Sequence, residues 1–321
     1  MDIELLISGE NGTAMYQPVL EEGIEWTTER RSTPGKLTFS VLDDGKISFS
    51  EGSAVRLRKD GKNVFFGFVF TQKRNKKQII DVTAYDQLRY LQNKDTYVYE
   101  NKTAAQLVGM IAADFSLKTG TLEDTGFVIA SRVEDNTSLF DMIENALDLT
   151  LANKKGMYVL YDDFGRLTLK NVSGMYVNLL IDEAAGENYD YASTIDSGTY
   201  NKVKLAYNSK DSGKRQVYTA QDSANIDRWG VLQYYGTLSK GENGQAKAKA
   251  LLSLYNAKNR SLKITGAFGD IRVRAGSMVP VNLDLGDVKV KRFMMAEKVK
   301  HRFEKDAHFM DLTLVGGEFG A

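Results

Sequence analysis

Alternating apolar and polar residues dominate the first hundred positions. Leu, Phe and Val alternate with Lys, Thr and Ser over residues 36–41, a pattern typical of a strand with one buried face. Apolar residues alternate with arginines over residues 55–58, Asp60-Gly61 follows, and a long apolar run covers residues 64–70. Asp-Gly between apolar strands is a strong hairpin signal. With a further strand at residues 80–84, this segment is predicted to form a small β-barrel or sandwich.

The period changes from two to that of a helix near residue 100. Thr103 and Gln106 have the spacing of a capping box, and Leu107, Ile111 and Phe115 follow on one helical face. A weaker box at 138–141 predicts a second helix. A hairpin is expected over 158–170, so that two helices and a hairpin form an inserted α+β domain.

The last third returns to strands. We expect them at 202–207, 215–219 and from 261 onward, with loops at 208–214 and 239–244. Residues 245–258 lack Gly and Pro and predict an amphipathic helix. Its apolar side is expected to carry Ala250, Leu251 and Leu254.

A set of landmarks from the first strands recurs near the end of the chain. The first set is Gly52-Ser53-Ala54-Val55, Asp60, Val64, Val69 and Ile80-Asp81-Val82-Thr83, and the second is Gly276-Ser277-Met278-Val279, Asp284, Val288, Phe293 and Met310-Asp311-Leu312-Thr313. The spacing is conserved except that the last block lies six residues further on, as an enlarged hairpin loop would place it. One β unit used twice would let a chain present two copies of one interface, although chance similarity of two hairpins is the alternative.

Composition narrows the classes of protein. The chain has 321 residues, which suits two or three domains, and 42 basic residues balance 42 acidic ones. Because the net charge is zero, the chain as a whole is not expected to bind nucleic acid or an anionic membrane surface through electrostatic attraction. There is no cysteine and no run of about 18 apolar residues, and the start Met1-Asp2-Ile3-Glu4 has acids where a signal peptide would carry a basic region. We therefore expect a soluble product of the cytoplasm, without disulfides or membrane insertion.

Candidate chemistry is sparse. His301 and His308, with Asp306 and Asp311 nearby, form the one conceivable metal site, but both histidines are expected at a hairpin tip. The pair Asp162-Asp163 could suggest a glycosidase, yet it occupies a predicted turn, where Asp is favoured by its own backbone hydrogen bonds.

No phosphate-binding glycine motif or nucleophile elbow occurs in the chain. The sequence thus predicts no catalytic, cofactor-binding or metal-binding residues, no cofactor and no enzymatic activity.

Several motifs spread along the chain resemble the prophage-type baseplate hub proteins of contractile phage tails and tail-like bacteriocins. They are Ala84-Tyr85-Asp86-Gln87-Leu88-Arg89-Tyr90-Leu91, Ser131-Arg132-Val133-Glu134-Asp135-Asn136, Leu147-Asp148-Leu149-Thr150, Tyr158 to Gly165, Ala220-Gln221-Asp222-Ser223, Trp229 to Tyr234, Ala267-Phe268-Gly269-Asp270 and His308 to Leu314. The resemblance extends from about Trp26 to Phe319.

This resemblance implies a mainly β fold with an α+β insertion, in which two barrels of the tail-tube type stand in one chain. We expect the first barrel at 1–97, the inserted domain at 98–173 and the second barrel at 174–321, with a long helix and a loop-rich excursion near 208–244. The implied function is that of a structural baseplate hub: a homotrimer with pseudo-sixfold symmetry that joins the hexameric tail tube to the trimeric spike and nucleates tube assembly.

Other baseplate proteins and the tape measure protein are further implied partners, in a phage tail or a tail-like particle. A peptidoglycan hydrolase, or a cell-envelope binding component that uses the inserted domain, is the alternative.

Overall fold

The computed structural model describes residues 1–9, 12, 14–21, 23–196, 198–208, 215–238, 243–284 and 289–316. The chain divides into two compact units. The larger one comprises Met1–Thr150, Gly156–Asp190 and Leu262–Ala321, and the smaller one comprises Leu151–Lys155 and Tyr191–Ser261. Within the described residues, no helix is both long and apolar enough to cross a membrane.

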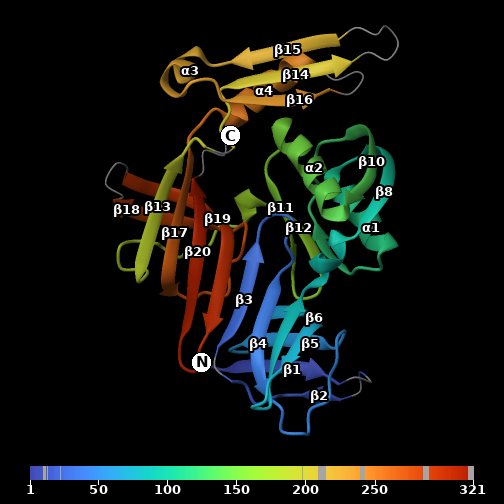
Figure 1. Cartoon of the computed structure of the whole chain (residues 1–321), viewed down its shortest axis with the longest axis vertical. Coiled ribbons are helices and arrows are strands. Elements are labelled where there is room, and N and C mark those ends of the chain that lie inside the picture. Colours follow the sequence, from blue (N-terminus) through green and yellow to red (C-terminus); the bar gives the residue numbers. More distant parts are fainter. Residues whose placement is uncertain are drawn as a thin grey trace. The chain divides into compact units, whose positions relative to one another are not determined.

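The fold is mostly β (Figure 1). Its strands are β1 (Ile3–Ser8), β2 (Met15–Tyr16), β3 (Ile24–Glu29), β4 (Lys36–Leu42), β5 (Ala54–Lys59), β6 (Lys62–Arg74), β7 (Ile79–Tyr85), β8 (Lys94–Lys102), β9 (Thr119–Leu122), β10 (Ile129–Ser138), β11 (Tyr158–Asp162), β12 (Leu167–Asn171), β13 (Asn188–Thr194), β14 (Lys202–Asn208), β15 (Arg215–Gln221), β16 (Gln233–Thr237), β17 (Asn259–Phe268), β18 (Met278–Asp284), β19 (Lys289–Phe303) and β20 (His308–Gly316). The helices are α1 (Ala104–Asp114), α2 (Leu139–Ala152), α3 (Ser223–Trp229) and α4 (Gly244–Tyr255), with short 3-10 turns at Gln87–Gln92 and Val172–Gly174.

One sheet of twelve strands organises the larger unit. Its order is β13-β17-β20-β19-β3-β4-β7-β6-β5-β1-β2, and β18 also pairs with β19. Long β19 has β20 along one edge, while β18 and β3 share the other. The described sheets are open, so the two closed barrels expected from the sequence are not confirmed. The physical reason is that β3 pairs with β19 and so joins the two halves into a single sheet.

The predicted repeat has the same strand order in both halves. β5-β6-β7-β4-β3 in the first half corresponds to β18-β19-β20-β17-β13 in the second. Gly52 and Gly276 each lie two residues before the equivalent strand, β5 or β18, with a positive φ of 89° and 90°. Each donates its N–H across the hairpin, to Val69 O and to Ala296 O, at 2.8 Å in both cases. Chance similarity of two hairpins is therefore excluded for these segments.

The structure corrects the alignment in the middle of the repeat. Val69 corresponds to Ala296 and not to Phe293, because a bulge interrupts β6 after Val69 and β19 after Ala296. The landmark Val288 lies outside the described residues. Beyond the bulge, residues 80–83 and 310–313 again correspond as predicted, since both blocks face the same part of their partner strands.

The inserted region forms its own apolar core. Thr103 caps α1 through the predicted capping box with Gln106, and Ser138 Oγ accepts from Asp141 N at the start of α2, at 3.1 Å. Both helices bury their apolar faces against β8, β10 and the three-stranded sheet β11-β12-β9. Burial of this many Leu, Ile, Val and Ala side chains stabilises the region by the hydrophobic effect, at roughly 25 cal/mol per Å².

The smaller unit is a three-stranded sheet, β15-β14-β16, covered by α4. The predicted helix over 245–258 is confirmed as α4, although Asn243 already caps it, so that the expected loop ends earlier than residue 244. Loop residues 209–214 and 239–242 lie outside the described chain. The predicted apolar side was partly wrong. Gly244 and Ala248 are the buried residues of α4, and Leu251 packs against the same core, whereas Leu254 is 44% exposed because it lies away from the sheet.

Candidate functional site

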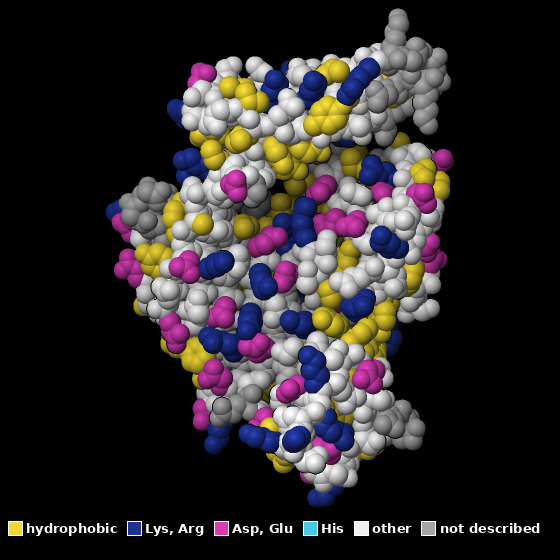
Figure 2. Space-filling view, in the orientation of Figure 1, with side chains coloured by type: hydrophobic (Ala, Val, Ile, Leu, Met, Phe, Trp, Pro, Cys, Tyr) yellow, Lys and Arg dark blue, Asp and Glu magenta, His cyan; other side chains and the backbone are white. Residues whose placement is uncertain are grey.

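The two halves share a continuous polar face on the large sheet. It consists of the outward side chains of β20, β19, β3, β4, β7 and β6. They are Asp311 and Thr313; Lys298, Lys300 and Arg302; Glu25, Thr27 and Glu29; Lys36, Thr38 and Ser40; Asp81 and Thr83; and Thr71 and Lys73. Figure 2 shows acidic and basic side chains interspersed over this sheet. The opposite side of the same strands carries buried apolar residues, because successive side chains alternate between faces.

Ion pairs join the two halves at the centre of the polar face. Lys298 on β19 lies opposite Glu29 on β3, with Nζ 2.6 Å from Oε1. Lys300 Nζ is likewise 2.6 Å from Glu25 Oε1. These side chains are partly exposed, so each pair contributes at most about 1 kcal/mol to stability. Their effect is to favour the correct cross-strand register, since a shift of one residue would turn them to the apolar side.

A shallow depression of about 480 Å³ lies within the polar face. It is lined by residues from both halves, among them Glu25, Thr38, Asp81 and Arg302. Ser40 Oγ donates to Asp81 Oδ1 at 2.6 Å along its wall. Hydroxyls and charges of both signs suit a hydrated surface better than an apolar ligand pocket.

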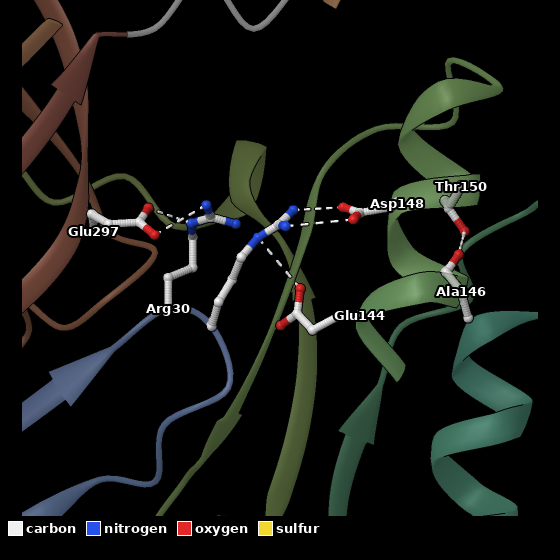
Figure 3. Close-up of polar contacts among 7 residues, drawn as sticks. Arg30, Glu144, Ala146, Asp148, Thr150 and Glu297 are labelled. Carbon is white, nitrogen blue, oxygen red and sulfur yellow. Dashed lines mark hydrogen bonds and ion pairs between the residues drawn. The ribbon is translucent and has the colours of Figure 1, made fainter. Parts of the chain in front are cut away.

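The loop between β3 and β4 ties the sheet to the inserted region (Figure 3). Arg30 makes a two-pronged bond to Glu297 on β19, at 2.6 and 3.1 Å. The next residue, Arg31, reaches Asp148 Oδ1 at 2.5 Å and Glu144 Oε2 at 3.4 Å, both on α2. Burial raises the pKa of Glu144 to about 7 against the opposing charge of Arg31. Burial by itself lowers the pKa of Arg31, but the two carboxylates outweigh it and the pKa is raised.

Asp162 and Asp163 occupy the predicted turn. Asp162 Oδ1 accepts from Gly165 N at 2.6 Å, and Asp163 N donates to Arg166 O at 2.8 Å. Local hydrogen bonding of this kind is why Asp is favoured in turns. The sequence did not predict that Asp162 is also buried, with Gln87 Nε2 donating to it at 3.0 Å.

A buried arginine lies beside this turn. Arg274 donates to the backbone oxygen of Asp162 at 2.8 Å and its guanidinium lies 4.0 Å from the Tyr161 ring centroid. Burial lowers the pKa of Arg274, and it raises that of Asp86, with the nearby charge of Asp162 adding to the second shift. Asp86 also accepts from Gly35 N at 3.0 Å. Asp86, Asp162 and Arg274 thus connect three segments of the larger unit that are distant in the sequence. The one sequence signal for this cluster was Arg274 itself, a charged residue between apolar Val273 and Ala275.

The predicted hairpin around the two histidines is confirmed as β19–β20, but both histidines are core residues beside its turn and not part of the exposed tip. His301 is fully buried and His308 is 8% exposed. His301 Nε2 lies 2.8 Å from Val273 O, which can only accept, so this nitrogen carries the proton. His301 Nδ1 then accepts from His308 Nε2 at 2.9 Å. Rings of Trp26 and Phe303 stack against the pair.

Burial keeps both histidines neutral. It is the largest cause that lowers the pKa of His301 to about 3 and that of His308 to about 4. Asp311 is bonded to Gly266 N at 3.0 Å, and Asp306 is exposed in the turn. Across the described chain, no three acidic or histidine side chains are grouped so as to hold a metal ion.

Comparisons with known proteins agree with the fold. A family model described as YQBQ-like matches residues 24–315. The uncharacterized protein YqbQ of Bacillus subtilis is 31% identical, over 98% of this chain and 96% of that protein. The phage-like element PBSX protein XkdQ of the same organism is 28% identical, over 92% and 93%.

The structure is also similar to that of the 43 kDa tail protein of prophage MuSo2 from Shewanella oneidensis. The TM-score is 0.70 at 14% identity, covering 97% of this chain and 98% of that one, a likeness that shows the fold. The resemblance to prophage-type tail hub proteins that the motifs predicted is confirmed. By its sequence over nearly the whole length, this chain belongs to the YQBQ-like family.

Proposed function

We propose that this chain is the structural hub of the baseplate in a phage tail or a phage-tail-like particle. In this proposal three chains form a ring with pseudo-sixfold symmetry, which joins the hexameric tail tube to the trimeric spike and nucleates tube assembly. The observation that carries it is the shared strand order of β5-β6-β7-β4-β3 and β18-β19-β20-β17-β13 within one sheet. Two similar units per chain let a trimer present six similar surfaces.

The polar face gives the ring a hydrated inner wall. In both halves the apolar side chains lie on the opposite side of the sheet. The polar face continues without interruption across the β3–β19 junction. We assign it to the channel, because mixed charges and hydroxyls remain solvated there and bind no passing chain strongly. This assignment keeps the proposed domains, 1–97, 98–173 and 174–321, with both tube-like units contributing to the wall.

Relatives support a role in assembly. XkdQ is described as a protein of a phage-like element, and the similar structure from Shewanella is a prophage tail protein. No observation favours the peptidoglycan hydrolase alternative, since His301, His308 and Asp162 are engaged in hydrogen bonds inside the protein. Nor does one favour cell-envelope binding by the inserted domain.

Co-expression with the neighbouring tube and spike proteins tests the proposal. Native mass measurement should give a complex with three copies of this chain and one spike trimer. The hub should also shorten the lag of tube polymerisation, because it presents several correctly placed edges at once. Replacing Lys298 and Lys300 by Gln removes these ion pairs without placing like charges opposite each other, and so provides a control on the channel wall: tube and spike binding should persist. A particle that contains the chain along the shaft, or a complex with one copy of it, refutes the proposal.

A further inference from the structure

The three-stranded sheet of the smaller unit, β15-β14-β16, has its apolar core on one side. Val203 and Leu205 of β14 are buried there, packed with Ala248 of α4. Side chains at the alternate positions point to the opposite side, because successive residues of a strand alternate between faces. This opposite side, here called the open face, is exposed: Val217 and Tyr235 on it keep 46% and 49% of their surface accessible.

The open face carries three cations and, among its described side chains, no acidic group. Strand pairing places its members opposite one another: Lys202, Lys204 and Ala206 on β14; Arg215, Val217, Thr219 and Gln221 on β15; and Gln233, Tyr235 and Thr237 on β16. All those on β15 and β16 are exposed, and the two lysines are half-buried. Figure 2 shows basic and apolar side chains together over these strands, whose place is given in Figure 1.

These cations lack the acidic partners that cations have on the large sheet. There, Lys298 and Lys300 each lie 2.6 Å from a glutamate oxygen. Within the described chain, none of the three cations of the open face forms an ion pair with an acidic residue. A chain of zero net charge thus concentrates unbalanced positive charge on one exposed face, which favours an anionic partner.

Arg215 and Tyr235 contact each other across the middle strand. They lie on the two outer strands, with β14 between them. Arg215 Nη2 nevertheless donates to Tyr235 Oη, and the guanidinium carbon lies 5.9 Å from the centre of the ring. The arginine side chain therefore crosses over β14 near Ala206, which is 1% exposed although it points to the open face. This cation–π contact orders both groups before a ligand binds.

The side chains of the open face fit a polymer that carries both phosphates and hydroxyl groups. Lysine and arginine bind phosphate oxygens through charge-assisted hydrogen bonds. The two threonines and two glutamines of the face both donate and accept hydrogen bonds, as ligand hydroxyls require, whereas the carboxylates of an acidic peptide only accept. Single-stranded nucleic acid is held by rings that stack on successive bases, but Tyr235 is the one ring among the described side chains of this face.

We propose that the open face of the smaller unit binds a phosphodiester-linked polyol or sugar polymer of the kind present in bacterial cell walls. Lys202 and Lys204 lie two residues apart on one strand, at a spacing of about 7 Å, and contact separate phosphates of the polymer. Arg215 binds a further phosphate, and the Tyr235 ring packs against the carbon atoms of one unit. This role goes beyond the proposed hub function and does not require the ring.

Calorimetric titration of the full chain with poly(glycerol phosphate) tests the proposal. The chain should bind this polymer and not uncharged dextran, and the affinity should fall as salt is raised, because phosphate contacts release counterions. Lys202→Gln with Lys204→Gln should weaken binding about fivefold or more, the scale of two exposed charge contacts. The matched control is Lys249→Gln with Lys258→Gln, which removes the same charge from exposed positions of the same unit outside the open face and should leave the affinity unchanged.

Two substitutions that keep all three cations give a second measurement. Thr237→Glu adds an acidic group to the face and should weaken binding, and Tyr235→Ser should weaken it more than Tyr235→Phe, which keeps the ring. Absence of binding, equal losses from the two pairs of lysine substitutions, or equal affinity for polyglutamate overturns the proposal. Tighter binding of oligothymidylate than of poly(glycerol phosphate) also overturns it and assigns the face to nucleic acid. None of these results affects the hub, which the mass of the complex with tube and spike tests separately.

Discussion

Replacing the buried histidine pair should remove much of the acid sensitivity of the larger unit. The perturbation is His301→Phe with His308→Phe, which keeps planar rings between Trp26 and Phe303. Both histidines have pKa values lowered by burial, to about 3 and about 4. Their contribution to stability is therefore complete above the unfolded pKa of about 6.5 and is lost as the pH falls toward 4.

The magnitude follows from proton binding. At pH 5 an unfolded histidine with a pKa of about 6.5 is stabilised by its proton by about 2 kcal/mol, whereas the buried pair remains neutral in the folded state. The wild-type chain should thus lose about 4 kcal/mol of unfolding free energy from this pair between pH 8 and pH 5. The double variant should lose none of it, whatever the replacement costs at pH 8.

Urea unfolding followed by tryptophan fluorescence measures this difference. Trp26 stacks on His301 with ring centroids 4.9 Å apart and reports on the larger unit. The chain has two tryptophans, so Trp229→Phe in both proteins makes Trp26 the sole reporter. Glu144 titrates in the same range with the opposite sign, but it is present in both proteins and cancels in the comparison. Equal losses of stability in the two proteins between pH 8 and pH 5 would refute the reasoning.

Three further predictions concern single residues. Because burial raises the pKa of Glu144 to about 7, stability is lost as the pH rises from about 4.5 to 7; Glu144→Gln should flatten this decline in urea titrations, and an unchanged slope contradicts it. Gly52→Ala and Gly276→Ala share the strain of φ near +90°, but only at Gly276 does a Cβ meet side chains at 2.9–3.1 Å. Overpacking should therefore lower the free energy of unfolding by about 1–3 kcal/mol more in Gly276→Ala than in Gly52→Ala, and a lower melting temperature of the first variant checks this. Arg274→Ala should lower the free energy of unfolding by about 3–5 kcal/mol, because it leaves buried carboxyls without their cation, whereas Arg272→Ala, at an exposed side chain, should leave the urea midpoint nearly unchanged; similar midpoints for the two variants would show that the buried cluster is not structural.

Local patterns predicted most of the secondary structure. The capping box at Thr103, the Asp60-Gly61 hairpin and the alternation of Lys36 to Val41 all depend on neighbours within a few residues, and each appears in the structure as predicted. The face of α4 was misjudged because the sheet that covers it, and not the spacing of its leucines, selects the buried side. The histidines were misplaced for the same reason: whether His301 lies at a tip or in the core depends on strands that are distant in the sequence.

Sequence patterns indicated that one β unit occurs twice, with chance similarity as the alternative, that an α+β region lies between the copies, and that the chain resembles tail hub proteins. Each of these features depends on short stretches of sequence that can be recognised one at a time. The folded chain alone shows that the two copies share one strand order, that β3 pairs with β19, that Val69 corresponds to Ala296, and that the polar side chains of both halves form one face. Strand pairing between distant segments is set by register and edge availability, which depend on all neighbouring strands at once and leave no signal in either strand alone.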